Sequence, residues 1–215
     1  AAPAFIKRQI AFFELLDEDG LTKIEQQADW LIENVGLEFR DDPPSLEHWC
    51  QAGAKVEGTR VTADAGMIRE LLKTAPREFQ QVARNPARTV TIGGMNQVFA
   101  PIYGAPFCRD LEGGRRYGTI ADLEKLVKLT QSLDSLHHTG LVIVEPCDVP
   151  VSKRHLDMLY LHMRYTDKPG LGAITEQSRA QDSVDMARIL HGAETFENNC
   201  VIMGNVNTNS PLLVD

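Results

Sequence analysis

The apolar stretch from Thr139 to Val144 constrains the fold of this chain more than any other segment. After Gly140 its residues are aliphatic and mostly β-branched, with no polar residue at alternate positions, which is typical of a buried strand. Such a strand needs cover on both of its faces, as in a parallel sheet with helices packed on each side. The sequence therefore predicts an α/β fold with a parallel sheet.

Two acidic residues follow this strand, Glu145 and Asp148, in a loop closed by Pro146 and Pro150. In parallel α/β folds, functional sites are built at the carboxyl ends of strands. Both carboxylates are therefore candidates for a site. Each also has a structural alternative: Glu145 could accept hydrogen bonds from the neighbouring loop, and Asp148 could form a turn or cap a helix.

From Gln97 onward, strand patterns alternate with helix patterns. Thr119 and Asp122 predict the start of one helix, Ser152 predicts the start of the next, and Gly192 predicts the end of a third. The repeat of about 30 to 40 residues is that of a right-handed βαβ unit. The predicted strands are Val98 to Tyr103, Thr139 to Val144, Gly170 to Ile174 and Cys200 to Val206.

Residues 1–95 differ from this pattern and predict a helical lead-in with a small hairpin and short strands. Thr22 and Glu25 form a capping-box pair before a helix that Gly36 ends, and Ser45 and Thr62 are further candidate caps. The segment from Lys55 to Val61 predicts a tight hairpin around Glu57 and Gly58.

Residues 96–215 predict the first four strands of a (β/α)8 TIM barrel, incomplete at the carboxyl end. A complete barrel takes about 250 residues, so we expect the chain to be the amino-terminal part of a longer protein. An open doubly wound sheet is the alternative, although no strand is followed by a GxGxxG turn.

The composition narrows the classes of partner and location. The net charge of -8, without a local block of Lys and Arg, argues against a nucleic-acid or anionic-membrane surface. The four cysteines form no CxxC pair, which favours reduced thiols over a disulfide framework. No apolar run approaches the roughly 20 residues that cross a bilayer. We therefore expect a cytoplasmic protein without nucleic-acid or membrane partners.

Several strings along nearly the whole chain occur in the same order in one known family, and they are specific when taken together. They are Asn34-Val35-Gly36-Leu37-Glu38-Phe39, Ala75-Pro76-Arg77-Glu78-Phe79, Ala83-Arg84-Asn85-Pro86, Asp110-Leu111-Glu112-Gly113-Gly114-Arg115-Arg116, Thr119-Ile120-Ala121-Asp122-Leu123, Cys147-Asp148-Val149-Pro150, Asn205-Val206-Asn207 and Ser210-Pro211-Leu212. With these strings the chain resembles the trimethylamine methyltransferase family of corrinoid-dependent methyltransferases, which includes glycine betaine methyltransferases.

The resemblance implies a (β/α)8 barrel preceded by a helical region. It implies transfer of a methyl group from a tertiary or quaternary methylated amine, such as trimethylamine or a betaine, to the cobalt of a corrinoid (cobalamin) carried by a partner protein. We expect this chain to bind no corrinoid tightly by itself, and we expect a homo-oligomer. Some family members carry pyrrolysine in the second half of the barrel, outside the stretch matched here, so the amine stays unspecified.

This chemistry requires a positioned cation and the exclusion of water, with little acid-base work from the protein. Acidic groups, aromatic faces and neutral hydrogen-bonding side chains at strand ends are suitable parts. The predicted substrate-binding residues are Glu145, Asn205, Asn207, Tyr103, Asp148, Thr175 and Glu176, and Phe107 could supply a further aromatic face. Tyr103 could instead belong to the core, and the asparagines could satisfy loop backbone groups.

Other functions remain as alternatives. His155 and His162 lie on one helix face, but neither an HExxH motif nor cysteine pairs accompany them, so a zinc site is disfavoured. The absence of a GxSxG motif disfavours a nucleophilic hydrolase, and Cys147 has no neighbour that clearly lowers its pKa. A non-catalytic binding protein for a small cationic amine and a different TIM-barrel enzyme stay open.

Overall fold

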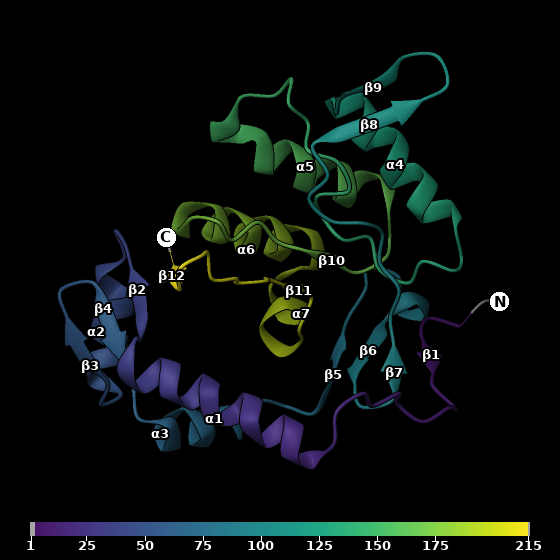
Figure 1. The fold of residues 1–215 in the computed structure, drawn as a ribbon. Coiled ribbons are helices and arrows are strands. Elements are labelled where there is room, and N and C mark those ends of the chain that lie inside the picture. Colours follow the sequence, from purple (N-terminus) through teal and green to yellow (C-terminus); the bar gives the residue numbers. More distant parts are fainter. Residues whose placement is uncertain (1–2, 215) are drawn as a thin grey trace. The chain divides into compact units, whose positions relative to one another are not determined.

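The computed structural model describes residues 3–214, which form two compact units of mixed α/β structure (Figure 1). The first unit contains residues 3–9 and Arg77–Asn205, and the second contains Ile10–Pro76 and residues 206–214. Together, residues 3–214 form seven α-helices and four small sheets, and none of these sheets closes into a barrel. None of the helices in this range is both long and apolar enough to cross a bilayer.

The second unit combines three helices with a four-stranded sheet whose order is β12-β2-β4-β3. Its β3–β4 hairpin confirms the one expected between Lys55 and Val61. The elements are α1 (Glu18–Asn34), β2 (Leu37–Phe39), α2 (Pro43–Gln51), β3 (Lys55–Glu57), β4 (Arg60–Thr62), α3 (Ala65–Leu72) and β12 (Leu213–Val214).

The predicted caps of these three helices are wrong. Aspartates take the cap positions instead of Thr22, Ser45 and Thr62, since a carboxylate also accepts the free amides of a first helical turn and favours the helix dipole. The caps are Asp17, Asp42 and Asp64, which accept from the amides of Gly20, Ser45 and Met67 at 2.9, 3.2 and 3.3 Å.

The chain leaves α1 through Gly36, as the sequence predicts. Gly36 has a φ of +70°, and a Cβ atom there would lie 2.2 Å from the carbonyl oxygen of Val61. Only glycine fits this turn without displacing β4. The turn directs β2 onto β4, where Phe39 and Val61 form the small core of the second unit with Ala54 and Ala63.

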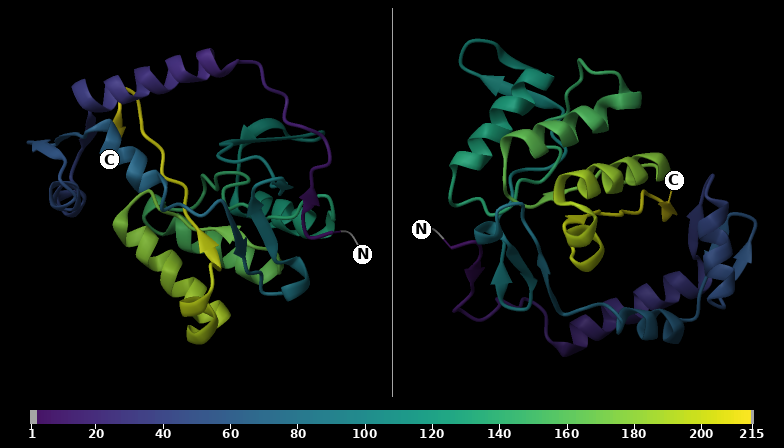
Figure 2. Two further views of the ribbon diagram at one scale, coloured as in Figure 1. Left: turned by 90° about the horizontal axis from the view of Figure 1, so that it is seen from below. Right: turned by 180° about the vertical axis from the view of Figure 1, so that it is seen from behind.

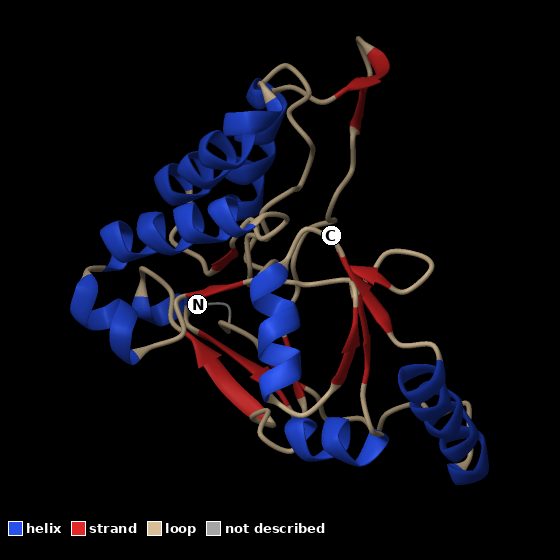
Figure 3. Ribbon diagram, turned by 90° about the vertical axis from the view of Figure 1, so that its left-hand side faces the viewer, coloured by secondary structure: helices blue, strands red, loops and turns tan. Residues whose placement is uncertain are grey.

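The first unit contains the other helices, which Figure 3 colours blue. α4 contacts α5, and α5 contacts α6. The helices are α4 (Ile120–Ser132), α5 (Val151–Tyr165), α6 (Gln177–His191) and α7 (Ala193–Asn198), and the strands are β1 (Ile6–Lys7), β5 (Glu78–Gln81), β6 (Val90–Gly93), β7 (Asn96–Gln97), β8 (Phe107–Asp110), β9 (Gly114–Tyr117), β10 (Gly170–Leu171) and β11 (Ile202–Met203), with a short 3-10 helix at Pro86–Arg88.

The predicted boundaries of these helices are mostly confirmed. Thr119 and Asp122 form the expected capping box of α4, with bonds of 3.2 and 3.0 Å. Gly192 follows the last residue of α6. Ser152 is not a cap, because α5 begins at Val151 after Pro150, whose fixed φ suits the start of a helix.

The core of the first unit is the stretch that the sequence marks as buried. Leu141 and Val144 are each 1% exposed, and they pack with Leu123 and Val127 of α4 and Leu159 of α5. Burying an aliphatic side chain of this size contributes about 1.5 to 3 kcal/mol. The prediction that helices cover this stretch is therefore confirmed.

The four predicted strands are wrong in extent. Val98 to Tyr103 and Thr139 to Val144 form no strand, and only Gly170–Leu171 and Ile202–Met203 remain of the other two. Two causes are visible. Pro101 has no amide to donate to a ladder, and Gly140 has a φ of +67°, which breaks the alternation of an extended chain.

The same four segments nevertheless run parallel in chain order. Phe99 accepts from the amides of His137 and His138, and Gly104 donates to Val142 at 2.7 Å. Thr139 donates to Pro169, and Gly140 accepts from Leu171. Thr139 and Gly140 therefore share the two hydrogen bonds that a single residue makes in a regular parallel ladder. β10 pairs in parallel with β11. Glycine and proline thus interrupt a parallel arrangement without reversing it.

Basic side chains cap the carboxyl ends of two helices in this unit. Lys168 is buried and donates to Thr130 and Leu133 at the end of α4, at 2.6 and 2.8 Å. Arg84 donates to Met163 and Thr166 at the end of α5, at 2.7 and 3.0 Å. Both cations satisfy carbonyls that a helix leaves unpaired and oppose the negative end of its dipole.

Asn85 supports this arrangement by holding the loop between α5 and β10. Its side-chain amide donates to Asp167 at 2.9 Å, and Arg88 contacts the same carboxylate at 3.0 Å. The string Ala83-Arg84-Asn85-Pro86 therefore has a structural role in this chain.

Two buried histidines fill the space between the parallel segments. Gly140 donates to Nδ1 of His138 at 2.9 Å, so Nε2 carries the proton and donates to the side chain of Gln81 at 3.1 Å. His162 lies between the Thr139 hydroxyl and the Leu141 carbonyl, each at 2.7 Å. Burial lowers the pKa of both imidazoles to about 4.

We expect acid to destabilise this protein through these two histidines. In the unfolded chain a histidine takes up a proton near pH 6.5, whereas His138 and His162 stay neutral in the fold until about pH 4. Their contribution is therefore fully present above pH 6.5 and is lost as pH falls toward 4, at roughly 3 kcal/mol each. Urea unfolding at several pH values measures the slope.

His162→Gln should flatten that slope by about one proton between pH 6.5 and 4. The matched control is His48→Gln, because His48 is exposed. An equal slope in both variants would contradict the assignment.

Arg84→Met should lower the free energy of unfolding by about 1 to 2 kcal/mol, because two carbonyls at the end of α5 lose a charged donor. Arg77→Met removes an exposed arginine nearby in the chain and should change stability by less than about 0.5 kcal/mol. Urea midpoints at neutral pH compare the two, and equal losses would show that Arg84 is not a helix cap of consequence.

Candidate functional site

The acidic loop after Val144 is held by backbone bonds to two neighbouring segments. Glu145 donates its amide to Ala105 at 2.8 Å, and Cys147 donates to Gly118 at 2.9 Å. A Cβ atom on Gly118 would lie 2.3 Å from Val144 and 2.8 Å from the carbonyl oxygen of Glu145. The loop therefore packs directly against the chain that enters α4, and it has a fixed position in the first unit.

Glu145 is fixed by Arg154, which lies one turn inside α5. One guanidinium nitrogen of Arg154 contacts Oε1 of Glu145 at 2.7 Å, and the other nitrogens donate to the Val149 carbonyl at 3.1 and 2.9 Å. The Arg154 side chain is 17% exposed and the Glu145 side chain is 30% exposed. Within residues 3–214, Oε2 of Glu145 accepts no hydrogen bond, so one carboxylate oxygen is oriented and the other is available.

Asp148 has the structural role that was its alternative. Its carboxylate accepts from the amide of Ile120 at 2.8 Å and thereby satisfies a free donor in the first turn of α4. It also places a negative charge at the positive end of that helix. Glu145 and Asp148 thus share a loop and bind to different helices.

Thr175 and Glu176 lie at the start of α6 and share one partner. Arg179 donates to the Thr175 hydroxyl at 3.1 Å and contacts the Glu176 carboxylate at 2.9 Å. Glu176 occupies the cap position of α6 without a capping bond from its side chain. These two residues therefore form a local cluster of their own.

Tyr103, Asn205 and Asn207 are exposed side chains. The Tyr103 side chain is 54% exposed, so the structure does not place it in the core. Asn205 is exposed at the end of the first unit, and Asn207 is exposed in the second unit. The structure brings together Glu145 with Asp148 and Thr175 with Glu176, and it leaves these three residues as single exposed side chains.

Sequence reasoning missed two arginines that organise this region. Arg154 lies one helical turn after the acidic loop. Its spacing from Pro150, where the helix starts, was the signal in the sequence that could have identified it as a partner of that loop. Arg116 binds both Asp122 at 2.8 Å and Asp110 at 2.9 Å. Its guanidinium holds the pKa of Asp122 far below the usual range. This clamp joins the β8–β9 hairpin to α4.

The histidines of α5 have structural partners. His155 lies 2.7 Å from the carboxylate of Asp182 on α6, while His162 is held by Thr139 and Leu141. Among residues 3–214, no three His, Cys, Asp or Glu side chains gather as a metal site.

Comparison with known proteins identifies the family of this chain. The model of the family described as Trimethylamine methyltransferase (MTTB) matches residues 2–215. A glycine betaine methyltransferase of Desulfitobacterium hafniense (strain Y51) is 39% identical over 204 residues, which are 94% of this chain and 42% of that relative. A proline betaine:corrinoid methyltransferase of Eubacterium limosum is 23% identical over 190 residues, 85% of this chain and 39% of that relative.

The chain thus spans about two fifths of the length of these curated relatives. The family match, in contrast, covers all but one of its residues. The resemblance that the sequence strings indicated is confirmed, and this chain belongs to the trimethylamine methyltransferase family.

Proposed function

We propose that the protein to which this chain belongs moves a methyl group from a methylated amine, in particular a betaine, to the cobalt of a corrinoid on a separate protein. The observation that carries this proposal is the 39% identity over 94% of the chain to a glycine betaine methyltransferase. The second relative, whose name includes both a betaine and a corrinoid, supports the same reaction class.

The proposed fold of the site is the amino-terminal half of a (β/α)8 barrel after a lead-in of residues 1–95. Four segments that run parallel in chain order, with α4, α5 and α6 between them, support this proposal. In such a barrel the loops after the strands surround the substrate. The loop of Glu145 and the start of α6 at Thr175 and Glu176 are two of these loops.

The corrinoid supplies a strong nucleophile that accepts the methyl group. The carbon–nitrogen bond breaks, and its electron pair stays on the amine nitrogen. The protein therefore has to hold the cation in line and keep water away. We propose that Oε2 of Glu145 faces the ammonium group, with Arg154 fixing the other oxygen. Tyr103, Asp148, Asn205, Asn207, Thr175 and Glu176 are the further proposed substrate contacts.

We also propose that the protein works in the cytoplasm and forms a homo-oligomer. The four cysteines are free thiols in the structure, which suits a reducing compartment.

The direct test is methyl transfer by the full-length protein to free and protein-bound cob(I)alamin. A panel of glycine betaine, proline betaine and trimethylamine should give turnover with at least one betaine, followed by the absorbance of the methylated corrinoid. Tight binding of a betaine without turnover would favour the binding-protein alternative. If the protein showed no binding and no turnover with any of the three amines, the proposal would be wrong.

Glu145→Gln should weaken binding of a quaternary ammonium substrate about tenfold, which corresponds to about 1.4 kcal/mol. A neutral isostere with carbon in place of the ammonium nitrogen should change by less than about twofold. Calorimetry with both ligands measures the difference. Glu194→Gln is the matched control, because it makes the same change at an exposed carboxylate of α7 that is not among the proposed substrate contacts. Equal effects on the two ligands would rule out a charge role for Glu145.

A further inference from the structure

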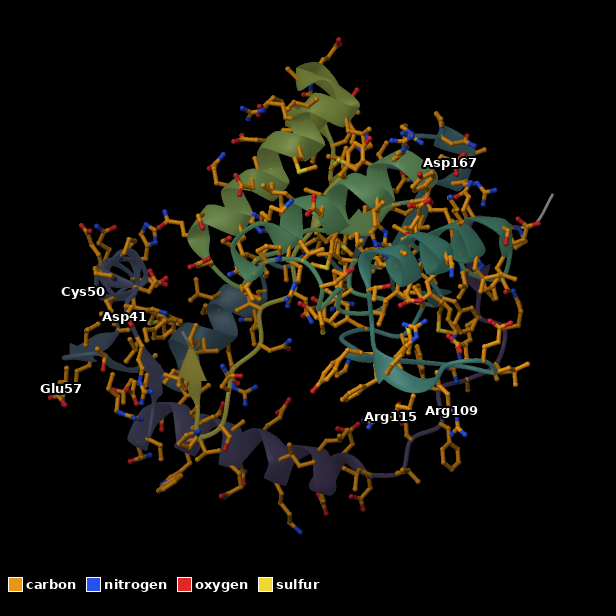
Figure 4. All side chains as sticks on the ribbon, turned by 90° about the horizontal axis from the view of Figure 1, so that it is seen from above. Asp41, Cys50, Glu57, Arg109, Arg115 and Asp167 are labelled. Carbon is orange, nitrogen blue, oxygen red and sulfur yellow. The ribbon has the colours of Figure 1, made fainter. Side chains whose placement is uncertain are left out.

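The β8–β9 hairpin exposes paired positive charge on a chain whose net charge is -8. Its register places Phe107 opposite Tyr117 and Arg109 opposite Arg115. Because side chains alternate along a strand, these four residues lie on one face of the hairpin, here called the cationic face. In Figure 4, Arg109 and Arg115 extend from the hairpin on the side away from α4.

The other face of the hairpin is fixed to the first unit. Arg116 bridges Asp110 of β8 and Asp122 of α4. Two carboxylates and one guanidinium in this geometry hold the hairpin beside α4 (Figure 1), and its turn projects outward in the right-hand view of Figure 2. The cationic face is therefore presented on a rigid support.

The two arginines of the cationic face repel each other, and fold stability does not explain why they are paired. Arg109 and Arg115 are directly opposite, and like charges in that position destabilise a sheet. Within residues 3–214, neither arginine forms an ion pair that would offset the repulsion.

The aromatic residues of this face extend the exposed surface. The Arg115 guanidinium lies 3.6 Å from the centre of the Phe107 ring, and the Phe107 and Tyr117 rings lie 4.7 Å apart. Tyr117 is 63% exposed. Exposed arginine and tyrosine side chains, held in place by stacking, are the residues that protein interfaces favour.

The position of the hairpin identifies its partner. Gly118, which follows β9, donates to Pro106 at 3.1 Å and accepts from Cys147 at 2.9 Å. The hairpin thus rises from the same loops that hold Glu145. In the proposed reaction, a corrinoid protein must approach these loops to bring its cobalt to the methyl group.

We propose that the cationic face is a docking surface for the corrinoid protein, and that it binds an acidic surface beside the corrinoid. This inference rests on the proposed function. Arginine pairs with carboxylates through two parallel hydrogen bonds, so two neighbouring arginines select a cluster of Asp and Glu. Exposed charges of this kind act mainly on the rate of association, and salt screens them.

The test compares two charge-matched double variants of the full-length protein. Arg109→Gln with Arg115→Gln removes the charge of the cationic face, and Arg77→Gln with Lys125→Gln removes two exposed charges elsewhere in the first unit. The probe is corrinoid protein purified by its cobalamin absorbance from cells that make the methyltransferase. Stopped-flow mixing at about 50 and 500 mM NaCl measures association, after urea midpoints have shown that both variants fold as the parent does.

The hairpin variant should associate about tenfold more slowly at low salt, with the difference shrinking at high salt. Its methyl transfer to free cob(I)alamin should equal that of the parent. Equal association of both variants would overturn the proposal. The proposal would also be overturned if the hairpin variant lost binding of inorganic phosphate or duplex DNA to the same extent, because the arginines would then attract any anion. Absence of transfer to both free and protein-bound cob(I)alamin in the parent would refute the proposed function instead, while association would still report on docking.

Discussion

The first unit depends on satisfying backbone groups along a buried stretch that does not form a regular ladder. A buried amide or carbonyl without a partner costs about 1 to 3 kcal/mol, and Gly140 and Pro101 interrupt the bonds that a parallel sheet would supply. Side chains replace them. His138 accepts from Gly140, His162 donates to Leu141, and Gln81 donates to Gly170 at 2.7 Å.

The charged side chains of the first unit lie at two ends of its parallel segments. Arg84 and Lys168 close the carboxyl ends of α5 and α4, where the chain turns back toward the parallel segments. The loop of Glu145 and the β8–β9 hairpin lie where those segments finish, and their arginines are partly exposed. The charged groups of the first end stabilise the fold, whereas the second end also carries Arg109 and Arg115, which form no ion pair within residues 3–214.

Much of this arrangement could be predicted from the sequence, for reasons that particular residues make clear. The aliphatic stretch at Leu141 to Val144 indicated a core covered by helices, and Thr119 with Asp122 indicated the start of α4. Strand extents could not be predicted, since the φ of Gly140 depends on its neighbours in space. The partners of Glu145 and Asp148 were also beyond reach, because Arg154 and Ile120 meet them only through tertiary packing.

The close approach at Gly118 links the hairpin to the acidic loop mechanically. No space remains between the backbone of residue 118 and the atoms of Val144 and Glu145. A shift of the hairpin base at Gly118 therefore has to move the Val144 side chain and the backbone of Glu145 as well. A protein that binds the hairpin and displaces its base would therefore also displace the backbone at Glu145.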